Sequence, residues 1–180
     1  MNTKAPKSSG NFVIAKGAVV CAEAQLTGDV TIGTQTVVHP SAKILAEGGP
    51  IIIGEGNLIQ EEVTIINRKP ENGEEATPLI IGRGNVFEVK SHCESKCVGD
   101  FNTLEAKSFV GPRVTVTEQC VIGAGCTVDS METISPNTVM YGSKCTRYIK
   151  TIPAHASNQQ QLEYLIKVLP NYHHLTKSTS

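Results

Sequence analysis

The sequence is poor in aromatic residues, in net charge and in long apolar runs. It has no Trp, four Phe and four Tyr, which leaves few rings on which nucleic acid bases could stack. Its 16 Lys and Arg nearly balance its 17 Asp and Glu, so no bulk charge favours binding to nucleic acid or to an anionic membrane. No apolar run approaches the length of a transmembrane helix, about 18 residues, and the polar segment 1–10 does not resemble a signal peptide. We therefore expect a soluble, cytoplasmic protein without nucleic acid partners or membrane insertion.

β-Branched residues are abundant instead. The chain has 17 Val, 16 Ile and 17 Thr against nine Leu. Such side chains crowd a helix and suit a pleated strand, so the composition predicts a mainly β protein. The six Cys are expected to be reduced thiols, because disulfides seldom persist in a reducing cytosol.

Apolar residues recur every six positions along most of the chain. This period fits a flat strand followed by a corner, three of which close a triangular coil. A shift of two residues at 47–50 and a surplus of ten residues at 68–77 interrupt the repeat. The inward positions predicted from this register are Ile14, Val20, Leu26, Ile32, Val38, Ile44, Ile52, Leu58, Thr64, Ile80, Val86, His92, Val98, Leu104, Val110, Val116, Ile122, Val128, Ile134 and Met140. A second column of small residues, including Gly56, Gly84, Cys120 and Cys126, is expected at the corners.

Two segments depart from the repeat. Residues 67–78 carry five charges and two Pro, which predicts an exposed loop. Residues 157–160 match a capping box, and Pro170 would end the helix that follows. The apolar residues of that helix, at helical spacing, are Leu162, Leu165, Ile166 and Leu169. We expect a flexible N-terminus at 1–11, a solenoid at 12–150, a linker with an amphipathic helix at 151–175 and a tail at 176–180.

The six-residue period resembles that of the hexapeptide-repeat family, whose members fold as left-handed parallel β-helices. The left hand comes from this resemblance, since general crossover rules favour the right hand. The expected fold is an all-β solenoid, a left-handed parallel β-helix of about six to seven coils with one C-terminal α-helix.

An enzymatic alternative follows from the same resemblance, because the family includes acyltransferases and γ-class carbonic anhydrases. The stretch from Pro50 to Glu61, followed by a loop and Leu79–Gly82, is similar to the γ class. The positions at which that class has three zinc-binding His are occupied here by Ile66, Val89 and Glu94. Aliphatic side chains cannot replace imidazoles in an open zinc site, so we expect no cofactor and no catalytic residue.

Other candidate sites have simpler explanations. His92, Cys93, Glu94 and Cys97 could bind a metal, but the predicted register turns His92 inward and its neighbours outward. Cys120 and Cys126 are expected to fill corners as small apolar residues. His39 could imitate an acyltransferase base, although no acidic residue lies near it in sequence, and His173–His174 has too little around it to define a site.

The C-terminal segment carries a more specific resemblance. Gln161–Leu175, a Leu-rich helix followed by Leu-Pro-Asn-Tyr-His-His-Leu, resembles the end of the dynactin subunit 6 family of β-helical pointed-end subunits. Val13 to Leu175 agrees with that family in several further stretches. The resemblance implies a non-catalytic subunit that supports dynein-driven transport along microtubules and attachment of cargo or adaptors. It implies as partners dynactin subunit 5, dynactin subunit 4 and the pointed-end actin-related protein.

Helix docking or partner binding is expected at one set of residues, which comprises Leu162, Leu165, Ile166, Leu169 and Tyr172. The resemblance also implies a cytoskeletal location and a possible kinetochore role, which in some relatives depends on a Thr-Pro site beyond the position of Leu175. The only Thr-Pro of this chain is Thr77-Pro78, in the expected loop.

Overall fold

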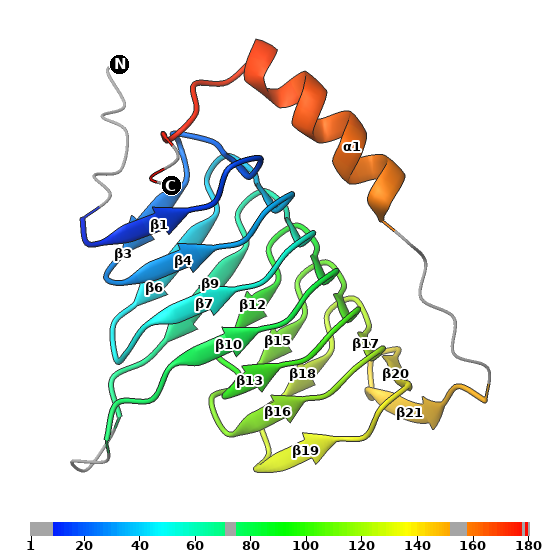
Figure 1. Ribbon diagram of the computed structural model, residues 1–180. Coiled ribbons are helices and arrows are strands. Elements are labelled where there is room, and N and C mark those ends of the chain that lie inside the picture. The colour runs from blue at the N-terminus through cyan, green and yellow to red at the C-terminus, as the bar shows by residue number, and fades with distance from the viewer. Residues whose placement is uncertain (1–8, 71–74, 152–157, 178, 180) are drawn as a thin grey trace, which may run out of the picture.

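The computed structural model describes residues 9–70, 75–151, 158–177 and 179, and over these the chain winds as a parallel β-solenoid (Figure 1). Sheet I contains β1 (Phe12–Ile14), β4 (Val30–Ile32), β7 (Ile51–Ile53), β10 (Leu79–Ile81), β13 (Cys97–Val98), β16 (Val114–Val116) and β19 (Glu132–Ile134). Sheet II contains β2 (Val19–Val20), β5 (Val37–Val38), β8 (Leu58–Ile59), β11 (Val86–Phe87), β14 (Thr103–Leu104), β17 (Val121–Ile122), β20 (Thr138–Tyr141) and β21 (Thr146–Ile149). Sheet III contains β3 (Gln25–Thr27), β6 (Lys43–Ala46), β9 (Thr64–Asn67), β12 (His92–Cys93), β15 (Phe109–Val110) and β18 (Thr127–Val128).

The three sheets form the faces of a triangular prism whose core is a stack of inward side chains. Seven strands in sheet I correspond to about seven coils, so the predicted all-β solenoid is confirmed. One buried cluster runs the length of the prism, from Ile14 in the first coil to Met140 in the last. Each coil except the last adds one strand to each of the three sheets, as expected for a solenoid that buries its apolar faces by stacking.

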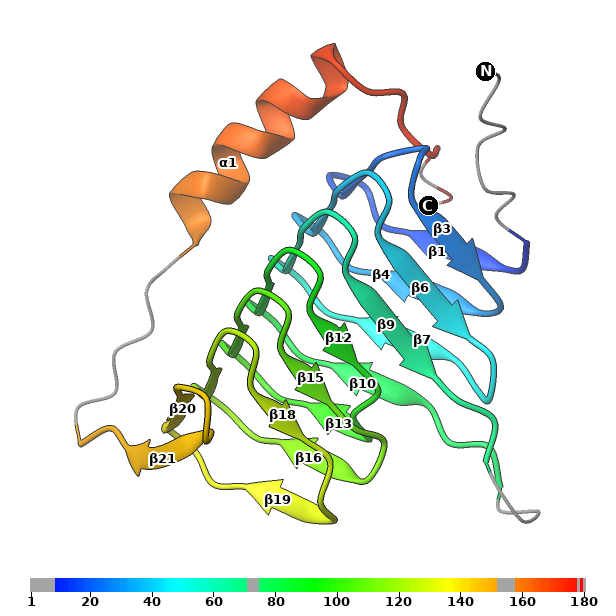
Figure 2. The same cartoon turned by 180° about the vertical axis from the view of Figure 1, so that it is seen from behind.

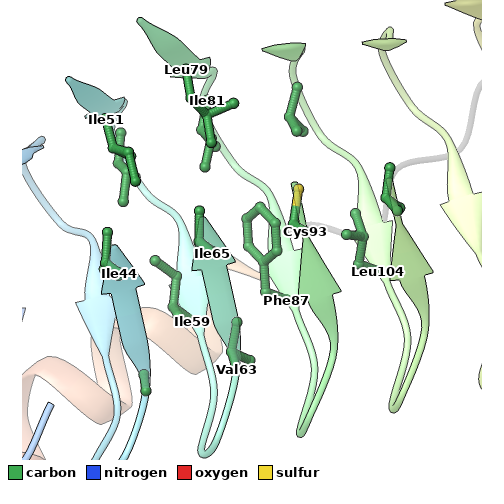
Figure 3. Packing of buried hydrophobic residues seen from close by; sticks show 14 of the residues in the cluster. Ile44, Ile51, Ile59, Val63, Ile65, Leu79, Ile81, Phe87, Cys93 and Leu104 are labelled. Atoms are coloured by element: carbon green, nitrogen blue, oxygen red, sulfur yellow. The ribbon is translucent and has the colours of Figure 1, made fainter. Parts of the chain in front are cut away.

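The predicted register is wrong by one residue in the middle of the chain. Ile32 pairs with Ile53, 21 residues on, whereas Ile14 pairs with Ile32, 18 residues on, so the shift at 47–50 is three residues and not two. Ile81 pairs with Val98, 17 residues on, which restores the first frame. The residues that point inward in these coils are Ile53, Ile59, Ile65, Ile81, Phe87 and Cys93, five of which are labelled in Figure 3. The residues predicted there were Ile52, Leu58, Thr64, Ile80, Val86 and His92.

The corner between sheets I and II contains buried polar side chains. Thr36, Asn57, Asn85, Asn102, Cys120 and Thr138 stack there, one from each successive coil. The expected corner residues Gly56 and Gly84 lie one position earlier, where the backbone has positive φ. Gly84 is required there, since a Cβ would lie 2.5 Å from the ring of Phe101.

The C-terminal segment closes one end of the prism. Thr176 donates its backbone N–H to Val20 O (2.8 Å), and Ala22 donates to His174 O (2.7 Å), so this segment pairs with the first coil. At the other end β21 pairs antiparallel with β20. Both ends of sheet II are therefore covered by the chain itself, which satisfies backbone groups that an open edge would leave unpaired.

One α-helix is present among the described residues, α1 (Gln159–Val168), followed by the 3₁₀ turn η1 (Leu169–Asn171). Figure 2 shows α1 alongside the prism, spanning several coils. The N-cap of the helix is Asn158, whose side chain forms no capping hydrogen bond. Ser157, the predicted cap, lies outside the described residues.

Candidate functional site

The apolar side of α1 packs on the outer surface of sheet II. Leu162 and Leu169 are buried, and Leu165 and Ile166 are half-buried beside them. The sheet contributes Val19, Val37, Leu58 and, at the margin, Val86 to this second cluster. The helix thus packs its apolar stripe against its own chain, with Leu165 and Ile166 still partly exposed.

Tyr172 lies apart from this contact. Its exposed fraction is 78%, so it contributes little to helix docking. A Tyr ring exposed to this extent suits a protein interface, because it offers a large contact area with a polar end.

A groove of about 240 Å³ lies between α1 and the neighbouring corner of the prism. Gly56, Gly84 and Phe101 line it from the solenoid, and Leu162 and Ile166 line it from the helix. Arg83 lies over the Phe101 ring, with its guanidinium carbon 5.4 Å from the ring centre. The lining of the groove combines these apolar groups with charged side chains that include Glu55, Arg83 and Glu163.

The three positions that correspond to the zinc ligands of the γ class form no metal site. Ile66 is buried, Val89 lies on the surface, and Glu94 forms an ion pair with Arg68 at the base of the exposed loop. His92 Nε2 contacts the same carboxylate at 2.7 Å. Burial opposes the ionisation of Glu94, but the hydrogen bonds from Arg68 and His92 outweigh it and lower the pKa of this carboxyl. The carboxylate is thus neutralised within the chain.

The four candidate metal ligands His92, Cys93, Glu94 and Cys97 do not lie on one side of the chain. The predicted register turned His92 inward and its neighbours outward, and the structure shows a different division. Cys93 points into the core, and burial raises the pKa of its thiol to about 12. His92 lies outside on sheet III, stacked on Phe109, and Cys97 lies on sheet I. Among the described residues, no three His, Cys, Asp or Glu side chains are grouped to bind a metal ion.

Cys120 and Cys126 are buried at two different corners. The Cys120 thiol donates to Ser135 O at 3.3 Å, and the Cys126 thiol donates to Gly142 O at 3.5 Å. Burial, followed by the effect of Cys145, raises the pKa of Cys126 to about 11. Both side chains thus fill corners as neutral thiols, with weak hydrogen bonds that the sequence did not indicate.

His39 has an acidic partner, contrary to the expectation from sequence. Its Nδ1 lies 2.8 Å from Glu61 Oε1 in the next coil. The solenoid brings together residues that are 22 positions apart, in neighbouring coils. A search for acidic residues close to His39 in sequence could not find this partner. The other ring nitrogen is buried, so a substrate could not reach it. At the first coil His173 Nδ1 similarly lies 3.4 Å from Glu23 Oε1.

Exposed apolar side chains gather at the C-terminal end of the prism. Met131, Tyr141, Tyr148 and Ile149 are all more than half exposed. Arg147 of β21 forms an ion pair with Glu132 of β19, which links these two strands at the end of the prism. Tyr141 and Tyr148 meet edge to face, with ring centres 5.8 Å apart. We call these four residues the end patch, and sequence periodicity missed them because they lie where the hexads end.

The solved structures similar to this chain identify its fold. A hexapeptide transferase family protein from Anaplasma phagocytophilum superposes with a TM-score of 0.70 at 18% identity, over 89% of this chain and 92% of that chain. A putative acetyltransferase from Bacillus cereus gives a TM-score of 0.52 at 20% identity, over 87% and 86%. The predicted left-handed β-helix is thereby confirmed. At such identities the similarity establishes the fold alone.

Sequence comparison gives the family. No family model matches the chain. Relatives named dynactin subunit 6 from Xenopus tropicalis, Nematostella vectensis and Danio rerio are 53%, 52% and 50% identical, over 94%, 92% and 92% of this chain. The matched regions cover 87%, 92% and 87% of those proteins. Since identity at this level extends over nearly the whole of both sequences, the chain belongs to the dynactin subunit 6 family.

Proposed function

We propose that this chain is a non-catalytic structural subunit of dynactin, situated in the pointed-end complex. The observation that carries the proposal is its identity of 50% or more to three relatives that bear the name dynactin subunit 6. Its partners would be dynactin subunit 5, dynactin subunit 4 and the pointed-end actin-related protein. In that complex it would support dynein-driven transport along microtubules and attachment of cargo or adaptors, in the cytoplasm and cytoskeleton and at the kinetochore.

The surface chemistry supports a binding role. The four exposed side chains of the end patch, two of them Tyr rings in edge-to-face contact, belong to the last coil and to β21 that follows it. Exposed aromatic and Met side chains are enriched at protein interfaces, and β19 ends its sheet with no further strand paired to it among the described residues. A second protein could cover both features at once. The first coil offers no such edge in sheet II, because the residues around Leu175 already pair with it.

The ion pair of Glu94 with Arg68 favours a structural over an enzymatic role. Residues that bind a catalytic metal must keep free lone pairs directed at an open position. Glu94 instead directs its carboxylate oxygens at Arg68 and His92, and Ile66 beside it is buried.

None of the helices in the described part of the chain is both long and apolar enough to cross a membrane.

Affinity purification of the tagged chain from cells tests the proposal. We expect dynactin subunits 4 and 5 and the pointed-end actin-related protein to co-purify in constant ratio with the chain. Replacing Tyr148 and Ile149 by Asp should reduce their recovery at least tenfold, because charges would enter the end patch. The matched control replaces Glu163 and Lys167, two exposed residues of α1, by Ala. A folded wild-type chain that recovers no dynactin subunit would refute the proposal.

A further inference from the structure

The outer face of sheet I is flat and carries no charged side chain along its middle. The strand pairing aligns one outward residue per coil into a single row. We call this row the neutral ladder, and its members are Val13, Thr31, Ile52, Ile80, Cys97, Thr115 and Thr133. Val13, Ile52 and Ile80 are 43%, 41% and 47% exposed. Ile52 and Ile80 are adjacent in the row and Thr31 separates them from Val13, so the face combines exposed aliphatic side chains with uncharged polar ones.

The other two faces differ from this one. The outward row of sheet II is covered by α1 over Val19, Val37 and Leu58. The outward row of sheet III includes Lys43 and His92, and is therefore polar. Sheet I is neutral and free of α1 along its whole outward row, whereas sheet II is free of α1 only beyond Val86, where its row continues as Thr103, Val121 and Val139.

Charged residues flank the neutral ladder on both sides. Because all strands of sheet I are parallel, their starts share one edge and their ends share the other. Lys96 and Arg113 are exposed at the strand starts. Asp100 and Glu118, of the same two coils, follow the strand ends, and Asp100 also forms an ion pair with Arg83 of its own chain at 3.3 Å. A neutral centre between charged margins is the usual anatomy of a protein interface.

We infer that the neutral ladder is a self-association surface, on which a second copy of this chain packs face to face with its prism axis parallel. A two-fold axis along the prism brings the strand starts of one copy over the strand ends of the other. Lys96 then faces Asp100 of the second copy, and Arg113 faces Glu118 of the second copy. Each contact occurs twice by symmetry, which gives four pairs of opposite charge.

The alternative two-fold arrangement, with the prism axes antiparallel, is disfavoured by charge. It would place β7 of one copy over β13 of the other. Strand starts would then face strand starts, and strand ends would face strand ends. Glu55 would then face Asp100 of the second copy, and Arg83 would face its own equivalent. Asp29, before β4, would face Arg113 of the second copy, so this arrangement pairs like charges as well as opposite ones. The parallel arrangement pairs only opposite charges and is the one that the margins favour.

The size of the face sets the expected affinity. Seven strands spaced by about 4.8 Å extend over roughly 30 Å, and a flat face about 20 Å wide gives roughly 600 Å² per copy. This area lies at the low end for stable protein pairs, which bury about 800 Å² on each side. We therefore expect a dimer that forms at micromolar concentrations and dissociates on dilution.

Sedimentation of the purified chain over a range of concentrations, together with disulfide trapping, tests the inference. In the parallel arrangement Cys97 faces Cys97 of the second copy, so mild oxidation should yield a disulfide-linked dimer. Cys97→Ser should abolish this product, whereas Cys145→Ser, at another half-buried thiol, should not. Ile80→Asp should raise the dissociation constant at least tenfold, and Ile149→Asp in the end patch should leave it unchanged.

Two results would overturn the inference. One is a wild-type chain that remains monomeric up to the order of 100 µM, well above the range expected for this area. The other is a dimer that Ile80→Asp does not weaken although the variant melts at the wild-type temperature. Because the assay uses the purified chain alone, its outcome is independent of membership in dynactin.

Discussion

Asn57 and Asn85 occupy equivalent corners of successive coils, and the side-chain oxygen of Asn57 accepts two hydrogen bonds from Asn85. The Oδ1 of Asn57 accepts the backbone N–H of Asn85 at 2.9 Å and its side-chain amide at 3.0 Å. Asn85 in turn accepts both groups of Asn102, at 2.8 and 3.1 Å. All three residues are completely buried. The hydrogen bonds between these Asn residues thus take the place of water for polar groups that the tight corner would otherwise leave unpaired.

Asn85→Ala should destabilise the protein by about 2 to 3 kcal/mol. The change removes the acceptor of the Asn102 N–H and leaves this buried group unpaired. Chemical denaturation with an unchanged m-value would measure the loss. Asn171→Ala is the matched control, at an exposed Asn that bonds only Lys167 O, and should cost under about 0.5 kcal/mol. Equal losses of unfolding free energy for the two variants would contradict a stabilising role for the hydrogen bonds between the corner Asn residues.

The fold was predictable from sequence because a six-residue period has few structural solutions, and two regular stretches each span several coils. The register between these stretches was not predictable. Three Ile occur together at 51–53, and Leu79 precedes two more, so residue type cannot decide whether the middle residue of each run or its two neighbours point inward. An error of one residue exchanges the two faces of a strand. Backbone pairing across the insertion decides it, and that pairing depends on corner geometry.

Site residues were predictable only where contacts are local in sequence. The helix stripe containing Leu162 follows from helical spacing, which the structure retains. The contacts of His39 with Glu61 and of Arg68 with Glu94 join neighbouring coils across an irregular spacing. The second of these also crosses the 67–78 insertion. Their prediction would have required the correct register.

Paired substitutions at adjacent positions test the corrected register. Ile65→Asp should unfold the protein or cost several kcal/mol, because an unpaired carboxylate would enter the apolar core. Thr64→Asp, one residue earlier and facing outward beside Lys43, should cost under about 1 kcal/mol. Thermal melts of the two variants measure the difference. Reversed effects would restore the register first predicted.

The ion pair between Glu132 and Arg147 should make stability fall in acid. The hydrogen bond from Arg147 lowers the pKa of Glu132 to about 2, from an ordinary value of 4.5. A lowered pKa stabilises the folded state above pH 4.5, and the contribution is lost as the pH falls toward 2. Because Arg147 is 44% exposed, solvent screening limits the contribution to about 1 kcal/mol.

Denaturation of Glu132→Gln at pH 7 and at pH 2.5 measures this contribution. The variant should be less stable than the wild type at pH 7, and the difference should narrow at the lower pH. The matched control is Glu118→Gln, at an exposed residue, which should leave the free energy of unfolding at pH 7 unchanged. A difference that widens in acid would contradict the assignment.

The purified protein should contain no stoichiometric zinc and should not hydrate carbon dioxide. Ile66 and Val89 offer no ligand atom, and Glu94 is bound by Arg68. Elemental analysis and a hydration assay measure both properties, with a γ-class carbonic anhydrase processed in parallel as the positive control. One equivalent of zinc together with chelator-sensitive hydration would instead identify an enzyme.

The last prediction concerns the cluster that attaches α1 to sheet II. Leu162→Ala should destabilise the protein by about 2 to 3 kcal/mol, because Leu162 is almost fully buried against a sheet surface that includes Val37 and Leu58. Glu163→Ala is the matched control. It removes an exposed side chain that accepts a hydrogen bond from Gln159 Nε2 at 3.2 Å, and should cost under about 0.5 kcal/mol.

Hydrogen exchange separates loss of the helix contact from general unfolding. In Leu162→Ala the amides of α1 should exchange faster than those of β14 and β17, since Thr103 and Val121 belong to coils whose core contacts remain. Because the tail around Leu175 pairs with β2 downstream of the helix, its amides should also exchange faster when α1 is loosened. If the melting temperature and the exchange of α1 both match the wild type, the helix does not contribute to the stability of the prism.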